Sequence, residues 1–194
     1  MPPPKAIRPL TDFFPDRPIE LEIGSGKGLY ILARAAADPG WGFVAIEVRG
    51  KHARVAEERA RKRGLANILV LEGDALRMLP ALGPDGCLAR VSVHFPDPWW
   101  KRRHEKRAVL TPGTLDGIVR LLAPGAEIYV QTDVFDRAER LLRLLTDHAL
   151  LENASPGGGL LDAPPVPATS SREQKCLDAG LPVFRMLFRR TPSR

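Results

Sequence analysis

The chain has 194 residues and a net charge of +6, and 44% of its residues are hydrophobic. This suits one globular domain over residues 1–194, and no apolar stretch is long enough to span a membrane or to serve as a secretion signal. Cys87 and Cys176 lie far apart without metal-site spacing, so we expect reduced thiols, no bound metal and a cytoplasmic protein.

The first half of the chain alternates short apolar runs with helical patterns. Residues 1–17 form an N-terminal extension, for which a mobile arm and an idle terminus both stay open. The strands are predicted at Ile19–Gly24, Trp41–Val48 and Asn67–Ala75. The helices are predicted at Leu29–Ala37, Lys51–Gly64 and Leu76–Leu82.

The same alternation continues in the second half. Strands are predicted at Cys87–Phe95 and Ala126–Asp133, and helices within Thr111–Gly125 and over Val134–Leu151. A glycine- and proline-rich loop, a short helix (Glu173–Ala179) and a strand (Pro182–Arg190) follow. Five strand-to-helix alternations predict an α/β fold, in which a doubly wound parallel sheet carries helices on both faces.

Each of the first five predicted strands ends in or is followed by a carboxylate. These residues are Glu22, Glu47, Asp74, Asp97 and Asp133. Because ligands of open parallel sheets bind beyond the carboxyl ends of the strands, we expect all five at one edge. Such an edge would bind hydroxyls, amines and amide-like groups.

The glycine loop after the first strand narrows the choice of ligand. Gly24 and Gly26 allow close approach of a cofactor, and Glu47 has the spacing of a ribose-binding acid. Glu22 would repel a pyrophosphate but attract an ammonium, which favours S-adenosylmethionine over a nicotinamide cofactor. Asp74 could accept from the adenine amino group or cap the next helix, and both readings stay open.

Two short segments hold the excess positive charge. Arg49–Arg63 has seven arginines and lysines against two glutamates, and Lys101–Arg107 has five against one. The clustering indicates a surface for a polyanion, although two solvated basic surfaces would give the same pattern.

A set of motifs occurs in a recognisable order: "LEIGSGKG", "AIEVRGK", "EGDA", "FPDPWWKRRHEKR", "QTD" and "SSREQKCLDAGLPVFRMLFRR". In these motifs the chain resembles the bacterial tRNA (guanine-N7-)-methyltransferase family from about Glu20 to Arg190. The resemblance implies a Rossmann-like class I methyltransferase fold, with a mostly parallel seven-stranded sheet in three layers and an antiparallel last strand. It also implies S-adenosylmethionine as methyl donor and the variable-loop guanine of tRNA as acceptor.

The resemblance also implies roles for individual residues. The cofactor positions are Glu22, Gly24, Gly26, Glu47, Asp74, Ala75 and Asp97, and Asp97 is also the catalytic residue. The substrate positions are Lys101, Asp133, Ser170, Ser171, Arg172 and Glu173. Together with their charge, the neighbours of Lys101 are expected to dock tRNA; they are Arg102, Arg103, Lys106 and Arg107.

The chain departs from the family pattern at a few positions. Trp100 stands where proline is frequent, Ala108 where arginine is common, Ser170 where threonine is expected and Arg172 where phenylalanine is expected. Serine keeps the hydroxyl group, but the aromatic ring is lost at Arg172.

The chemistry needs little from the protein beyond alignment, because guanine N7 carries a free lone pair and attacks the methyl group directly. We expect Asp97 or Asp133 to accept from the guanine N1–H and amine, which become more acidic as the ring turns cationic. Stacking and simple packing both stay open for Trp99 and Trp100, and so do a structural and a catalytic role for His94.

Three other functions remain open at this stage: a nucleotide-binding oxidoreductase, an RNA-binding module without activity, and a methyltransferase acting on another acceptor. The glycine spacing argues against the oxidoreductase, and the full set of carboxylates argues against a module without activity. The basic run argues against a small-molecule acceptor. The sequence gives no oligomeric state and no role for the loop at residues 155–167.

Overall fold

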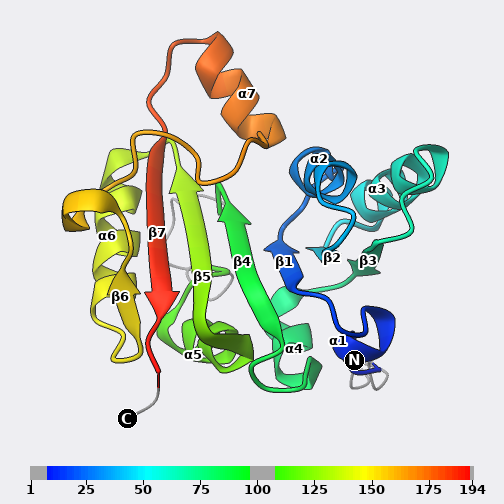
Figure 1. Cartoon of the computed structure of the whole chain (residues 1–194). Helices are drawn as coiled ribbons and strands as arrows, with labels where there is room; N and C mark the ends of the chain where they lie inside the picture. Colours follow the sequence, from blue (N-terminus) through cyan, green and yellow to red (C-terminus); the bar gives the residue numbers. More distant parts are fainter. Residues whose placement is uncertain (1–7, 97–107, 193–194) are drawn as a thin grey trace.

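The computed structural model describes residues 8–96 and 108–192, and within them a seven-stranded sheet forms the centre of the molecule (Figure 1). The strands run in the order β3-β2-β1-β4-β5-β7-β6. Neighbours from β3 to β5 pair in parallel, whereas β7 is antiparallel to both β5 and β6. The bounds are β1 Ile19–Ile23, β2 Gly42–Glu47, β3 Ile68–Glu72, β4 Leu88–His94, β5 Leu122–Thr132, β6 Leu151–Asn153 and β7 Phe184–Arg190.

Helices connect these strands and cover the sheet. They are α1 Leu10–Phe13, α2 Leu29–Ala37, α3 Gly50–Lys62, α4 Ala75–Met78, α5 Pro112–Leu121, α6 Phe135–Thr146 and α7 Ser171–Asp178, with short 3-10 turns η1 Leu79–Ala81 and η3 Pro156–Gly158. Within the part of the chain that the structure describes, no helix is long and apolar enough to cross a membrane.

The alternation of side chains along the strands divides the core into two clusters. Leu21 belongs to one cluster, together with Ile118 of α5 and Leu145 of α6. Phe43 belongs to the other, together with Ile31 of α2. The clusters occupy opposite faces of the sheet, so the predicted three-layer, doubly wound, mostly parallel fold with an antiparallel last strand is confirmed.

The predicted helix over Val134–Leu151 is too long. Helix α6 ends at Thr146, and Leu151 instead begins β6, where it pairs with Arg190 of β7. The leucines of α6 keep helical spacing up to Leu145, but Leu151 is buried through strand pairing. The sequence therefore did not reveal β6, because a short strand directly after an amphipathic helix continues the apolar pattern.

A proline divides another predicted helix. The segment expected to be one helix, Leu76–Leu82, is split into α4 and η1, with Pro80 in the first turn of η1. Proline has no N–H to continue the α-helical ladder, so the chain turns there. Pro112 has the opposite effect: it stands at the first position of α5, directly after Thr111, which forms a capping box with Thr114.

Candidate cofactor- and substrate-binding site

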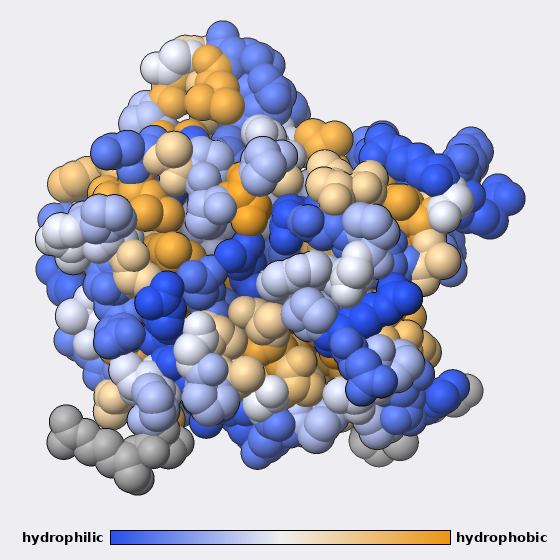
Figure 2. Space-filling model, viewed as in Figure 1, coloured by the Kyte–Doolittle hydropathy of each residue, from blue (hydrophilic) through white to orange (hydrophobic). Residues whose placement is uncertain are grey.

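A cavity of about 390 Å³ opens at the carboxyl ends of β1, β4 and β5, between α2 and α7. Glu22, Tyr30, His94, Asp133 and Arg172 are among the residues that line it. On the face seen in Figure 2, an apolar patch lies at the top over α7, and apolar and polar residues mix on the surface between α7 and α2. Leu177 of α7 and Leu181, which follows this helix, are exposed. The cavity lies where open parallel sheets bind ligands.

The glycine loop between β1 and α2 leaves room on the cavity side. Gly24 and Gly26 have φ of 77° and 57°, a region that disfavours side chains, and a Cβ added to either would meet nothing within 4 Å. Gly28 has a different task, because a Cβ there would lie 3.0 Å from Ala56 of α3. The first two glycines therefore leave space for a ligand, whereas the third allows α2 to pack on α3.

Glu47 holds this loop in place. One carboxylate oxygen accepts from the backbone N–H of Gly26 at 2.7 Å, and the other accepts from that of Arg49 at 2.8 Å. The side chain is buried at the end of β2. Each oxygen retains a lone pair, so Glu47 can still accept from a ligand hydroxyl, but its observed contacts are with the backbone.

Asp74 caps helix α4, which is one of the two readings that the sequence left open. Its side chain accepts from the backbone N–H of Leu76 at 3.0 Å. The side chain keeps 42% of its surface exposed, so an oxygen remains accessible. Ala75 is buried as the first residue of α4. A cofactor role for Asp74 and Ala75 stays a prediction.

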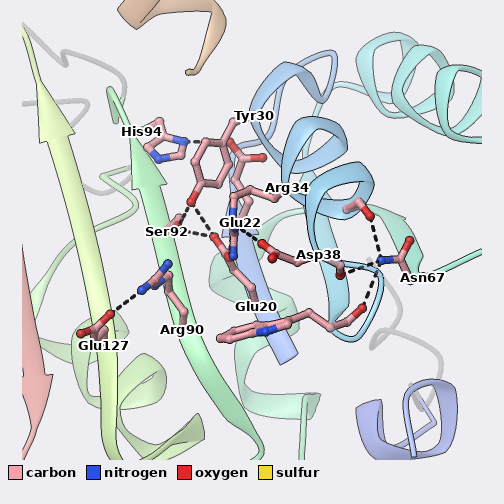
Figure 3. Close-up of polar contacts among 12 residues, drawn as sticks. Glu20, Glu22, Tyr30, Arg34, Asp38, Asn67, Arg90, Ser92, His94 and Glu127 are labelled. Atoms are coloured by element: carbon pink, nitrogen blue, oxygen red, sulfur yellow. Dashed lines mark hydrogen bonds and ion pairs between the residues drawn. The ribbon is translucent and has the colours of Figure 1, made fainter. Parts of the chain in front are cut away.

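Glu22 contacts His94, a residue to which the sequence assigned no binding role. Nδ1 of His94 lies 2.9 Å from one oxygen of the Glu22 carboxylate (Figure 3), and each side chain is only 3% exposed. The other carboxylate oxygen, Oε2, and Nε2 of His94 have no hydrogen-bond partner among the described residues. A buried polar atom without a partner costs about 1–3 kcal/mol, so this pair fits a cavity that receives a polar ligand.

A second buried carboxylate lies beneath this pair and is fully engaged. Glu20 has no exposed surface and accepts from Tyr30 at 2.7 Å, from Ser92 at 2.9 Å and from Arg34 at 3.1 Å (Figure 3). Burial, followed by the charge of Glu20, raises the pKa of Tyr30 far above its ordinary value. The network joins α2 to β1 and β4 and thereby fixes the wall of the cavity.

On the opposite wall, two predicted substrate residues bind each other. Nε of Arg172 donates to Oδ2 of Asp133 at 3.0 Å, and Nη2 of Arg172 donates to the same oxygen. This contact raises the pKa of Arg172 above its ordinary value. The thiol of Cys176 also points at this oxygen, at 3.7 Å. Asp133 is 14% exposed, and the guanidinium covers it from the solvent side.

Ser170 and Glu173 form the capping box that starts α7. The Ser170 hydroxyl accepts from the Glu173 N–H at 3.2 Å, and a Glu173 oxygen accepts from the Ser170 N–H at 3.4 Å. Glu173 also binds Arg185 at 2.7 Å and Gln131 at 3.1 Å and is 1% exposed. Glu173 therefore supports α7 from beneath, while Ser170 and Ser171 reach the cavity.

Several predicted residues lie outside the described part of the chain. They are Asp97, Lys101, Arg102, Arg103, Lys106 and Arg107, together with Trp99 and Trp100. Pro96, which precedes Asp97 in the chain, lines the cavity, and its carbonyl accepts from Arg137 at 3.1 Å.

The structure adds cavity residues that the sequence did not single out. Phe95 has φ of 48°, which is rare for a residue with a side chain, and lines the cavity beside His94. Tyr30 and Arg137 line it from α2 and α6. The position of His94 and Phe95 directly before the proline-flanked Asp97 was the one available signal. In residues 8–96 and 108–192, no cluster of three or more His, Cys, Asp or Glu side chains could hold a metal ion.

The strand order, the antiparallel β7 and the glycine loop beside edge carboxylates define a Rossmann-like methyltransferase. Solved structures agree on the fold. The 16S rRNA methyltransferase KamB superimposes with a TM-score of 0.66 at 17% identity, covering 94% of this chain and 93% of that one. TrmN from Thermus thermophilus gives 0.64 at 20% identity, covering 93% of this chain and 47% of that one.

Sequence comparison identifies the family. A family model described as "Putative methyltransferase" matches residues 16–186. The tRNA (guanine-N(7)-)-methyltransferase of Myxococcus xanthus is 40% identical over 87% of this chain and 81% of its own length. The protein of that name from Parasynechococcus marenigrum is 38% identical over 92% and 78%. The chain belongs to the tRNA (guanine-N(7)-)-methyltransferase family, which confirms the resemblance found in its motifs.

Proposed function

We propose that this chain transfers a methyl group from S-adenosylmethionine to N7 of a guanine in the variable loop of tRNA. The observation that carries the proposal is the glycine-lined cavity. Its lining includes Glu22, which has a buried carboxylate oxygen without a partner in the part of the chain that the structure describes. The relatives named as tRNA (guanine-N(7)-)-methyltransferases supply the acceptor. No second function is favoured by a specific observation.

The residues at the sheet edge fit this donor. Glu22 would bind the ammonium of the donor, and the space at Gly24 and Gly26 would admit the part of the donor that lies closest to the protein backbone. Glu47 would accept from the ribose hydroxyls, and Asp74 would accept from the adenine amine. When bound, the donor supplies an electrophilic methyl group on a positively charged sulfur. Glu47 already ties its own loop down, so its orientation needs no ligand to be fixed.

The acceptor requires alignment and charge stabilisation. Guanine N7 displaces the methyl group directly, so the protein need not remove a proton from the attacking atom. Asp133 borders the cavity and can accept from the guanine N1–H and amine once Arg172 releases it. By family resemblance, Asp97 would be the catalytic carboxylate and would follow the charge that develops on the ring.

The tRNA would bind through phosphate contacts beside this site. We assign these to Lys101, Arg102, Arg103, Lys106 and Arg107, which follow Asp97 directly in the chain. Contacts of this kind release counterions, so the affinity for tRNA should fall steeply as salt is raised. The cytoplasmic location stays a prediction of the sequence.

The direct test is to incubate the full chain with radiolabelled S-adenosylmethionine and bulk tRNA from cells that lack this modification, and then to analyse the nucleosides. We expect label in 7-methylguanosine. Label in another nucleoside would show that the acceptor is a different atom from guanine N7. No label in the tRNA would refute the proposed activity. Asp97→Asn serves as the comparison variant, which should lose turnover far more than donor affinity.

A further inference from the structure

His94 is among the most constrained side chains of the cavity. Its ring packs edge-on against Tyr30 with centroids 4.2 Å apart, and edge-on against Tyr129 with centroids 5.6 Å apart. Its Nδ1 contacts Glu22 at 2.9 Å. Three contacts from three elements therefore fix the imidazole, and they leave Nε2 as the ring nitrogen without a partner among the described residues.

The contact with Glu22 determines which nitrogen carries hydrogen. An ionised carboxylate can only accept, so Nδ1 of His94 must donate. In the neutral imidazole, Nε2 then has a free lone pair. Glu22 on β1 and His94 on β4 line the cavity from neighbouring strands, and each has a buried acceptor, Oε2 and Nε2, without a partner among the described residues.

The other carboxylates nearby are already engaged. Asp133 lines the same cavity but accepts from Arg172, and Glu20 accepts from Tyr30, Ser92 and Arg34. Among the described residues that line the cavity, Glu22 is the carboxylate with a fully buried oxygen that has no partner. A ligand group suited to this wall must be a cationic donor with more than one N–H.

We propose that Glu22 and His94 together form a subsite for a primary ammonium, with His94 as its second acceptor. The inference rests on the proposed function, under which this ammonium belongs to the methionine-derived end of the methyl donor. A primary ammonium has three N–H donors and no acceptor, so one group satisfies both atoms.

The test measures calorimetric dissociation constants for S-adenosylhomocysteine, its analogue without the amino group and its analogue without the carboxylate. The wild-type chain should bind the analogue without the amino group most weakly. The variant is His94→Asn, whose amide can still donate to Glu22 from the position of Nδ1 but has no atom at Nε2. It should weaken both amine-bearing ligands about tenfold, or about 1.4 kcal/mol, and the amine-free one less than about twofold.

His94→Gln is the matched control, because its amide oxygen can occupy the position of Nε2, and it should recover part of the affinity for the amine-bearing ligands. Thermal unfolding without ligand shows whether each variant keeps its fold. Three results for His94→Asn would overturn the subsite, even where 7-methylguanosine is formed. They are a loss of affinity confined to the ligands that carry the carboxylate, an equal loss of affinity for all three ligands, and no loss of affinity. If wild-type chain binds none of the three ligands, the donor of the proposed function falls together with the subsite.

Discussion

The two walls of the cavity differ in whether their charged side chains already have hydrogen-bond partners. On the wall made by β1, β4 and α2, Glu22 and His94 each keep one buried polar atom that has no partner in residues 8–96 and 108–192. On the wall made by the end of β5 and the start of α7, Asp133 accepts from Arg172. Behind this wall, Glu173 binds Arg185 and Gln131. The first wall therefore has buried acceptors that can gain a ligand contact, whereas on the second wall Oδ2 of Asp133 is already engaged by Arg172.

This difference predicts opposite balances of stability and binding on the two walls. A residue whose polar atoms are all satisfied contributes to stability, and its loss should unfold the protein more easily. A residue with an unsatisfied atom contributes less to stability and more to ligand affinity. Four measurements examine this contrast.

The largest effect is expected for Glu173→Gln. Glutamine preserves the size and the capping box of α7 but leaves Arg185, whose side chain is 9% exposed, without its counter-charge. Removing one partner of a buried ion pair costs about 3–5 kcal/mol, so the free energy of unfolding in urea should fall by that amount. The double variant Glu173→Gln/Arg185→Met should recover most of the loss; an unchanged midpoint in the single variant would contradict the role given to this pair.

Glu22→Gln should show the reverse balance. The amide oxygen can still accept from His94, while an NH₂ group replaces Oε2, the oxygen without a partner among the described residues. The free energy of unfolding should change by less than about 1 kcal/mol, but affinity for the donor should fall about 10- to 100-fold through the lost charge-assisted contact. Calorimetry with S-adenosylhomocysteine measures the second effect. Comparable losses in stability for Glu22→Gln and Glu173→Gln would remove the contrast between the walls.

The chain has two tyrosines, Tyr30 and Tyr129, and the pH dependence of stability through their ionisation tests both sides of the site in one experiment. Burial, aided by Glu20 for Tyr30 and by Glu173 for Tyr129, raises both pKa values well above the ordinary value. The unfolded state then loses phenolic protons from about pH 10 while the folded state keeps them, so stability falls as pH rises above that value, by up to about 1.4 kcal/mol per pH unit for each tyrosine.

Tyrosinate absorbance near 295 nm should therefore appear together with loss of helical circular dichroism. An ionisation near pH 10 in the folded protein would show that one of the tyrosines is accessible. Tyr30→Phe and Tyr129→Phe then assign the transition to one wall or the other.

The sequence was informative where a residue type has one dominant structural use. The alternation of apolar runs and helical patterns predicted the parallel sheet, because each strand and helix needs its own apolar face. For the same topological reason the glycine loop and the strand-end carboxylates were expected at one edge, and of these the glycine loop, Glu22 and Asp133 line one cavity. By contrast, the sequence did not predict β6, because Leu151 continues an apolar pattern that fits a helix and a strand equally well.

Side-chain pairing was the part that no pattern could give. The contact of Arg172 with Asp133 joins residues far apart in sequence, and that of His94 with Glu22 depends on two parallel strands meeting in a particular register. Ser170 and Glu173 were expected at the substrate, yet their spacing is also that of a capping box, which is the role seen for both. Sequence motifs predicted which residues belong to the site but not which of them bind one another.

The smallest effect is expected at the one contact that a substrate must displace. Arg172 is 53% exposed, and ion pairs of such exposure contribute about 0–1 kcal/mol. Under the proposed function, guanine competes with Arg172 for Asp133, so Arg172→Ala should raise kcat/KM for tRNA by up to about fivefold while leaving donor affinity unchanged. Arg172→Lys, which keeps a charge near Asp133, should remain close to the wild-type value. A fall in kcat/KM for Arg172→Ala would instead mean that the guanidinium moves onto the RNA, and the second wall would then gain a contact on binding just as the first one does.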